Sequence, residues 1–287
     1  MDFWPAFIGF IFLLLAPFIG MLVIGLDRKI TARMQNRIGP PVLQPLYDVI
    51  KLFGKEDKIV NRGQVVFAYA FFVMVVLATS LFCLRSDLLV IFFLLNAGAI
   101  FMVMGAYSTR SAFSTIGANR ELLQMLAYEP IFLLVIFSIG YAVKSFTIDA
   151  IYEPLILKLP LALVAMVIVL MIKMQKSPFD ISTAHTEIIS GTMVEYSGTY
   201  LGLLKLTHWY ELFLILGTMA LFVIIPGNFV LSIIAMLVLI AVVYGIVMLI
   251  DNITTRLTWD ALLKVALPLG IGLITANLIY VWYIGGA

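Results

Sequence analysis

The sequence predicts an all-α polytopic membrane protein, with about eight transmembrane helices and short amphipathic interfacial helices in its cytoplasmic loops. Of its 287 residues, 63% are hydrophobic and only 12% are charged, and its mean hydropathy is +1.12. A soluble globular domain is about 25% charged. Apolar segments close to the roughly 20 residues that cross a bilayer recur along the chain. They lie at about 3–26, 65–84, 87–107, 119–143, 157–174, 198–224, 229–250 and 262–283.

We treat residues 1–287 as a single integral membrane domain, and the lysine and arginine residues predict its orientation. The predicted cytoplasmic loops are 27–64, 108–118, 173–197 and 251–261. On that side lie Arg28, Lys29, Arg33, Arg37, Lys51, Lys55, Lys58, Arg62, Arg110, Arg120, Lys173, Lys176, Arg256 and Lys264. The opposite side has only Arg85, Lys144 and Lys158. We therefore expect both termini on the outer face, where an aromatic belt is formed by Trp4, Tyr280, Trp282 and Tyr283.

Few residues have the chemistry of a metal or cofactor site. Cys83 is the only cysteine, and the two histidines, His185 and His208, lack the spacing of a zinc or haem site. The sequence contains no glycine-rich phosphate-binding loop. We therefore expect no metal and no cofactor in this chain, and any redox centre on another polypeptide. The net charge of +2 gives no indication of nucleic-acid binding.

The first cytoplasmic loop contains a rigid turn followed by a short helix. Two prolines and a glycine exclude a helix over Arg37–Pro41. The apolar residues that follow recur at the spacing of one helix face, at Leu46, Val49, Ile50 and Phe53. This amphipathic helix is either an interfacial anchor or part of a docking surface for a soluble partner. That docking surface would contain Arg33, Arg37, Asp48, Lys51, Lys55 and Glu56.

The segment 119–143 contains ionisable residues at helical spacing. Glu121, Gln124, Tyr128 and Glu129 lie near one stripe. Pro130 removes a backbone donor beside Glu129, and such freed groups are tolerated only where protein or water meets them. Glu129 is therefore either a neutral, hydrogen-bonded carboxyl or a member of a proton or ion path that also includes Glu121 and Tyr128.

Three carboxylates lie in the predicted loop 173–197, at Asp180, Glu187 and Glu195. Pro178 ends the preceding helix, and Asp180 has the side chain of a helix cap. In a continuous following helix the three acids would lie on one side. A solvated acidic face is the ordinary explanation, whereas the apolar residues between them favour a helix partly buried against the bundle.

The segment 198–224 contains Lys205, His208 and Glu211, three residues apart in turn. A charged group at the centre of a membrane helix costs about 2.5–3.5 kcal/mol on insertion scales, so such groups are rarely accidental. Glu211 should lie near the middle of the membrane. The cluster is either a proton path or a structural cluster that neutralises itself, with Lys205 paired to an acid of another helix.

Five ordered motifs across roughly residues 20–215 resemble the membrane subunit of respiratory complex I that contacts the hydrophilic arm, known as the H-type or subunit 1 family. They are ARMQNRIGPPVLQPLYDVIKLFGKE, LLQMLAYEP, KSPFD, TEIISG and EYSG. Two segments look closer still to the group 4 energy-converting, Ech-type NiFe-hydrogenases: QKSPFDISTAHTE and THWYE.

The resemblance implies a membrane-anchoring and coupling subunit of an oxidoreductase complex, which is not itself catalytic. Its expected partners are a NiFe large subunit, a small subunit with 4Fe–4S clusters and an antiporter-like membrane subunit in a prokaryotic plasma membrane. Reduced ferredoxin would supply the electrons for hydrogen evolution, coupled to proton or sodium translocation. By position, Glu129 matches the family's intramembrane acid, and the carboxylates of 173–197 match its acidic loop.

Two departures bear on the choice between related functions. Complex I usually has an acid at Lys173 and a glutamate at His208, and Glu211 one turn on takes the latter role. These changes weaken the alternative of a quinone-site subunit in a complex I-type oxidoreductase. An independent transporter would be expected to show an inverted repeat, and none is visible. A passive anchor does not explain the ionisable groups inside the spans.

Overall fold

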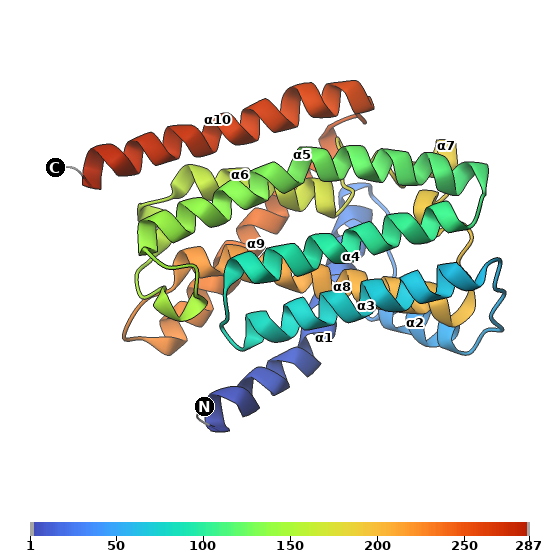
Figure 1. Cartoon of the computed structure of the whole chain (residues 1–287), viewed down its shortest axis with the longest axis horizontal. Helices are drawn as coiled ribbons and strands as arrows, with labels where there is room; N and C mark the ends of the chain where they lie inside the picture. The colour runs from blue at the N-terminus through green and yellow to red at the C-terminus, as the bar shows by residue number, and fades with distance from the viewer. Residues whose placement is uncertain (1–2, 286–287) are drawn as a thin grey trace. The chain divides into compact units, whose positions relative to one another are not determined.

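The computed structural model describes residues 3–285 and is helical along most of that length (Figure 1). The α-helices are α1 (Phe3–Met34), α2 (Gln44–Phe53), α3 (Arg62–Cys83), α4 (Leu88–Ser108), α5 (Ala112–Val143), α6 (Pro160–Lys173), α7 (His185–Ile188), α8 (Gly198–Ala220), α9 (Phe229–Ile253) and α10 (Trp259–Gly285). Short 3₁₀ turns lie at Ile148–Ala150, Leu155–Leu157, Gly191–Met193 and Leu221–Val223. The side chain of Trp4, expected in the outer aromatic belt, lies outside the described residues.

The chain is an all-α polytopic membrane protein, as predicted. Within the described residues, seven helices are long and apolar enough to cross a membrane, namely α1, α3, α4, α5, α8, α9 and α10. The remaining predicted segment, 157–174, forms α6, an apolar helix of 14 residues. At a rise of about 1.5 Å per residue it is roughly 21 Å long, shorter than a typical hydrocarbon core.

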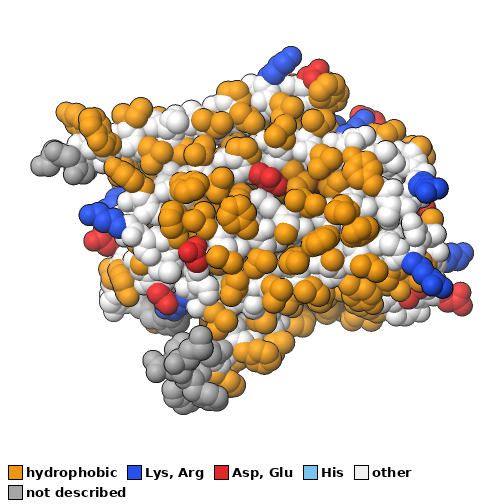
Figure 2. Space-filling model, viewed as in Figure 1, with side chains coloured by type: hydrophobic (Ala, Val, Ile, Leu, Met, Phe, Trp, Pro, Cys, Tyr) orange, Lys and Arg blue, Asp and Glu red, His pale blue; other side chains and the backbone are white. Residues whose placement is uncertain are grey.

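Side chains are distributed as a membrane environment requires. Figure 2 shows hydrophobic side chains along the helices of the face drawn, with lysine and arginine side chains at helix ends. Among the described helices that could cross a membrane, α8 is the most buried. Of the residues in its 18-residue apolar stretch, 67% are buried inside the protein, compared with 22% for α9. The helix that contains Lys205, His208 and Glu211 is therefore shielded by protein.

The described helices group into two compact units. The first contains residues up to 84, 90–122 and 182–214, and the second contains 85–89, 123–181 and the chain from 215 onward. α5 and α8 therefore contribute their N-terminal parts to the first unit and their C-terminal parts to the second.

The first unit is built around the packing of α1, α2 and α8. Met21, Val49 and Trp209 form a buried cluster, with Ile24, Leu46 and Leu206 packed against it. α1 approaches α8 closely at Gly20, where an added Cβ would overlap the backbone carbonyl of Trp209. This close approach fixes the distance between α1 and α8, the helix that contains Lys205, His208 and Glu211.

α2 buries one side against the first unit and exposes apolar residues on another. Pro45, Val49 and Leu52 are its buried residues, whereas Ile50 and Phe53 are exposed. Val49 packs against Met21 and Trp209, and the exposed Ile50 and Phe53 leave an apolar surface of the kind that an interfacial helix turns toward lipid.

In the second unit, α10 packs along α6. The buried side chain of Asn277 joins them, since its Oδ1 accepts from the backbone N–H of Leu161 at 2.9 Å and its Nδ2 donates to the carbonyl of Lys158 at 3.2 Å. The loop after α5 is fixed in a similar way, with Leu88 N–H bonded to the Phe146 carbonyl at 2.9 Å and Ile148 N–H to the Ser86 carbonyl at 3.2 Å.

The segment between α6 and α8 does not form the continuous helix expected after KSPFD. It contains only the four residues of α7 and one 3₁₀ turn. Ile189 and Gly191 adopt positive φ angles of 63° and 53°, a left-handed conformation that interrupts a right-handed helix. The expectations that Asp180 caps a long helix and that the three loop acids share its face are therefore wrong.

Replacing Gly20 with alanine should destabilise the chain, because the new methyl group would overlap the Trp209 carbonyl and force α1 away from α8. Overpacking of this kind costs about 1–3 kcal/mol. Thermal unfolding of the purified chain in detergent measures the loss. The matched control is Gly272→Ala in α10, where a Cβ meets nothing within 4 Å. Equal melting temperatures for the two variants would contradict the close packing of α1 on α8.

Candidate functional site

A buried ionisable pair of the first unit lies on α8. His208 Nδ1 and Glu211 Oε2 are 2.8 Å apart, and the side chain of Glu211 is only 6% exposed. Residues three apart lie on one side of a helix, which brings the two groups together. Phe71 of α3 covers the imidazole edge to face, with ring centroids 5.8 Å apart.

The second imidazole nitrogen of His208 is not used by the bond to Glu211. His208 Nε2 is buried and has no hydrogen-bond partner among the described residues. An imidazole exchanges protons through both nitrogens, donating from one while accepting at the other. The pair therefore has one nitrogen bonded to a buried carboxyl and one open to a proton-carrying group or a water molecule.

Lys205 extends the polar groups of α8 toward α2. On α2, Asp48 accepts from Arg28 Nη1 at 3.1 Å and from Gln44 Nε2 at 3.1 Å. The charge of Lys205 also acts on Asp48. A structural cluster that neutralises itself requires an acid of another helix near Lys205, and Asp48 of α2 is such an acid. The structure is therefore compatible both with a structural cluster and with a proton path along α8.

The environment of Asp48 keeps its carboxyl ionised. Partial burial raises its pKa, but hydrogen bonds from Arg28 and Gln44 and the positive charges of Arg28 and Lys205 outweigh that effect. The net pKa is below the ordinary value of 3.8. From the start of α8 to Glu211 the helix rises about 20 Å, so ionisable groups extend from the helix end beside α2 to its middle.

The end of the first loop is bonded to the first turn of α8. Asp57 Oδ1 accepts from the backbone N–H of Thr199 at 2.6 Å, and the Ser197 hydroxyl bonds both the N–H and the carbonyl of Lys58, at 2.9 and 3.0 Å. Gly198 has φ +55°, and a side chain there would overlap Asp57. Sequence reasoning missed Asp57 and Ser197, although the glycine of EYSG was a signal for a close backbone approach.

Two of the loop acids lie in the first unit. Glu187 pairs with Arg120 of α5 at 2.6 Å, and Glu195 is half-buried. Glu121, the residue after Arg120, is buried. Gly117 of α5 contacts the backbone of this loop so closely that an added Cβ would lie 2.6 Å from Gly191 Cα.

In the second unit, Tyr128, Glu129 and Lys173 lie together. The Lys173 ammonium is 5.1 Å from the centroid of the buried Tyr128 ring, within the range of a cation–π contact. Its charge also acts on the half-buried Glu129. Glu129 Oε1 is buried without a hydrogen-bond partner among the described residues. The buried amide of Gln124, one turn earlier, donates to the Phe179 carbonyl.

The KSPFD segment is tied to the last predicted cytoplasmic loop. Asp180 pairs with Arg256 at 2.8 Å, and Lys176 pairs with Asp251 at 3.0 Å. Asp251 also accepts from the Ser177 N–H at 2.9 Å. Neither Asp251 nor Arg256 was expected to take part in a site, because nothing in the sequence indicates which distant loop a charged residue will meet.

The residues expected to dock a soluble partner have two different environments. Arg33, Arg37, Lys51, Lys55 and Glu56 are exposed, whereas Asp48 is half-buried and ion-paired. Among the described residues, no group of three or more His, Cys, Asp or Glu side chains is arranged to hold a metal ion.

Comparison with known proteins gives consistent relatives. The sequence profile of a family described as NADH dehydrogenase matches residues 7–282. The chain is 30% identical to the H-type subunit of the NADH-quinone oxidoreductase of Syntrophotalea carbinolica, over 67% of this chain and 68% of that protein. It is 30% identical to formate hydrogenlyase subunit 4 of Escherichia coli, over 83% of this chain and 89% of that protein. It is 32% identical to hydrogenase-4 component C of Escherichia coli, over 68% and 66%.

A solved structure has the same fold. A chain of the membrane-bound sulfane sulfur reductase, an archaeal respiratory membrane complex, superposes with a TM-score of 0.85 and 29% identity. The match covers 95% of this chain and 98% of that chain.

Asp48→Asn should destabilise the chain at neutral pH and have little effect in acid. Because the pKa of Asp48 is lowered on folding, its contribution is fully present above the unfolded value, about 4, and is lost as the pH falls through the folded value. We expect about 0.5 kcal/mol, the magnitude of a partly exposed ion pair. The measurement is the melting temperature of the wild type and of Asp48→Asn, compared between about pH 3 and pH 7.

The control for that comparison is Glu56→Gln, which changes an exposed carboxyl in the same loop. A difference between wild type and Asp48→Asn that stays constant down to the lowest pH, or that is absent at neutral pH, would contradict the ion pair.

Proposed function

Because this chain belongs to the NADH dehydrogenase family, which includes the H-type subunit of complex I and the membrane subunits of group 4 hydrogenases, we propose that it anchors and couples a ferredoxin-dependent, hydrogen-evolving membrane-bound hydrogenase. Its proposed partners are a NiFe large subunit, a small subunit with 4Fe–4S clusters and an antiporter-like membrane subunit. The membrane is the plasma membrane of a prokaryote, with the long loops in the cytoplasm and both termini outside.

The extent of the sequence matches supports a hydrogenase complex. The relative named formate hydrogenlyase subunit 4 matches over 83% of this chain, and the NADH-quinone oxidoreductase relative over 67%. The identities are the same, 30%. The hydrogenase-type relative therefore accounts for more of the chain at equal similarity.

The observation on which the proposal depends most is the buried His208–Glu211 pair on α8, with Lys205 and the Arg28–Asp48 pair nearer the helix start. A carboxyl and an imidazole 2.8 Å apart can pass a proton between Oε2 and Nδ1. Lys205 lies three residues before His208 on α8, nearer α2. We propose that a change of charge beside α2 is transmitted along these groups to the buried pair.

Glu129 is the proposed second member of the path. Its partly buried carboxyl has one oxygen without a hydrogen-bond partner among the described residues, and the charge of Lys173 acts on it. Such a carboxyl can change its protonation without breaking a direct ion pair. Glu121 and Tyr128 are the proposed neighbours of the path, and Asp180, Glu187 and Glu195 are proposed to couple it to the peripheral arm.

The alternative is a quinone-site subunit of a complex I-type oxidoreductase, which the match to the NADH-quinone oxidoreductase relative supports. The positive charge beside Glu129 argues against a quinone site. Lys173 places a cation over Tyr128 and beside Glu129, at a position where complex I-like chains have an acid. A quinone found bound to the purified complex would favour the alternative.

Glu129→Gln and Glu211→Gln should each reduce ion transport coupled to hydrogen evolution by about 100-fold, the scale of losing a proton-transfer group. Hydrogen evolution from an artificial electron donor should persist, since the redox chemistry belongs to partner subunits. Transport is measured with a pH-sensitive dye in vesicles that contain the complex. Glu153→Gln, an exposed carboxyl in the loop before α6, is the matched control. Normal coupled transport in both test variants would refute the path.

Reversing the charge at both Lys51 and Lys55 should release the soluble arm, because both side chains are exposed on α2 or just after it and like-charge contacts strongly disfavour an interface. Native gel electrophoresis of solubilised membranes separates the intact complex from the membrane part. Lys264→Glu, at another exposed lysine expected on the same side, is the control. Intact complexes from the double variant would contradict the docking role.

A further inference from the structure

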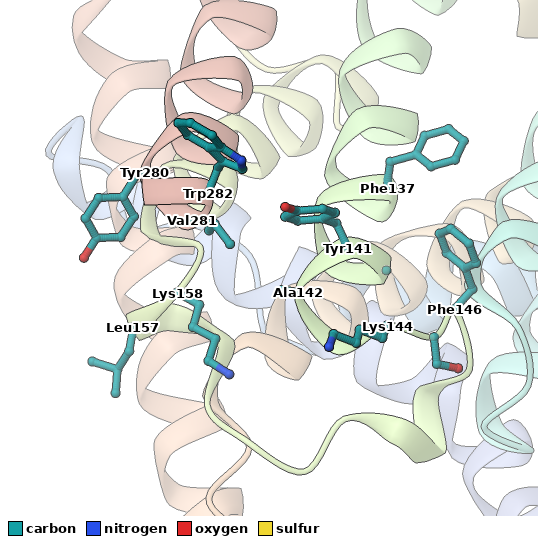
Figure 3. Close-up of a pocket in the computed structure, with 12 residues that line it drawn as sticks. Phe137, Tyr141, Ala142, Lys144, Phe146, Leu157, Lys158, Tyr280, Val281 and Trp282 are labelled. Carbon is teal, nitrogen blue, oxygen red and sulfur yellow. The ribbon is translucent and has the colours of Figure 1, made fainter. Parts of the chain in front are cut away.

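A cavity of the second unit lies where α5 and α10 end and α6 begins (Figure 3). Its volume is about 910 Å³. Aromatic and aliphatic side chains form most of its lining, and two lysines, Lys144 and Lys158, are its charged members. Nothing in the proposed ion path or docking surface uses these residues.

The walls of this cavity are held in place by specific contacts. Asn277 bonds the backbone of Lys158 and Leu161 to α10. Phe146 packs edge to face on Phe137, with centroids 5.8 Å apart, and its carbonyl accepts from Leu88 N–H. The cavity is therefore preformed, which lowers the entropy cost of binding.

The two lysines give the cavity a positive charge. In Figure 3 their ammonium groups point toward one another. Lys144 is exposed and forms no ion pair among the described residues. Lys158 pairs with Glu153 at 2.5 Å, and an ammonium group has three donors, so two remain. An anionic group between the lysines would satisfy donors from both.

An apolar groove continues from this cavity. Phe137, Tyr141 and Trp282 line the cavity and also line a second hollow of about 480 Å³, together with Leu278 and Ile279. Leu278 lies one turn before Trp282 on α10, so the groove extends from the helix end toward the helix middle. An occupant of both spaces needs an anionic end and a long apolar end.

Tyrosine and tryptophan at helix ends mark the headgroup level of a membrane. Tyr141, Tyr280 and Trp282 occupy the last turns of α5 and α10, which places the lysines at that level and the groove at acyl-chain depth. We propose that this site binds one anionic phospholipid, with its phosphate between Lys144 and Lys158 and an acyl chain in the groove beside Phe137 and Leu278. The charge match favours such a lipid over an apolar helix of a neighbouring subunit.

The test is native mass spectrometry of the intact purified complex, exchanged into detergent with either phosphatidylglycerol or phosphatidylcholine. Wild type should retain phosphatidylglycerol in preference to phosphatidylcholine, and added inorganic phosphate should not displace it. The double variant Lys144→Gln/Lys158→Gln should bind phosphatidylglycerol about 30-fold more weakly, since each interfacial lysine contributes about a factor of five. Lys264→Gln, at the other end of α10, should bind like wild type.

Glu153→Gln provides a change in the opposite direction, because it removes the carboxylate that occupies Lys158. It should bind phosphatidylglycerol at least as tightly as wild type, and weaker binding would overturn the proposal. Equal retention of both lipids, unchanged binding by the double lysine variant, displacement by free phosphate, or crosslinking of Lys144 to a neighbouring subunit would also overturn it. Lipid retention does not require turnover, so these results are independent of the proposed function.

Discussion

An ionisable side chain in the hydrocarbon of a membrane costs about 2.5–3.5 kcal/mol on insertion scales unless a partner or water compensates it, and this cost governs the arrangement around α8. The helix places His208 and Glu211 one turn apart, where each compensates the other at 2.8 Å. Phe71 and the close approach of α1 at Gly20 shield the pair from lipid. His208 Nε2 remains buried without a hydrogen-bond partner among the described residues. A pair with only a structural role would not require this unsatisfied nitrogen.

The first loop connects this buried pair to the region where a soluble partner is proposed to bind. Val49 of α2 packs beside Trp209, the residue after His208, and Asp48 joins α2 to Arg28 of α1. Asp57 then holds the first turn of α8. A displacement of α2 and the loop that follows it would therefore be felt by α8 both at its first turn and beside His208. In the second unit, the Lys176–Asp251 and Asp180–Arg256 pairs hold KSPFD against the last turn of α9 and the loop before α10.

Hydropathy and helical spacing were sufficient to predict the spans, because each apolar segment must satisfy its backbone hydrogen bonds within itself. The same reasoning located Glu129 and Glu211, since charges are rare in such segments. It could not orient α2, whose buried face depends on Met21 and Trp209 from distant parts of the chain. The ion pairs of Asp48 and Asp180 were also out of reach, because they join residues 20 and 76 positions apart.

The central claim is that the His208–Glu211 pair changes its protonation when the complex turns over. Infrared difference spectroscopy of the intact complex, recorded between the ferredoxin-reduced and oxidised states, tests it most directly. The account predicts a carboxyl band that shifts on reduction in wild type and is lost in Glu211→Gln. A difference spectrum without carboxyl bands, or one with the same carboxyl bands in both proteins, would contradict it.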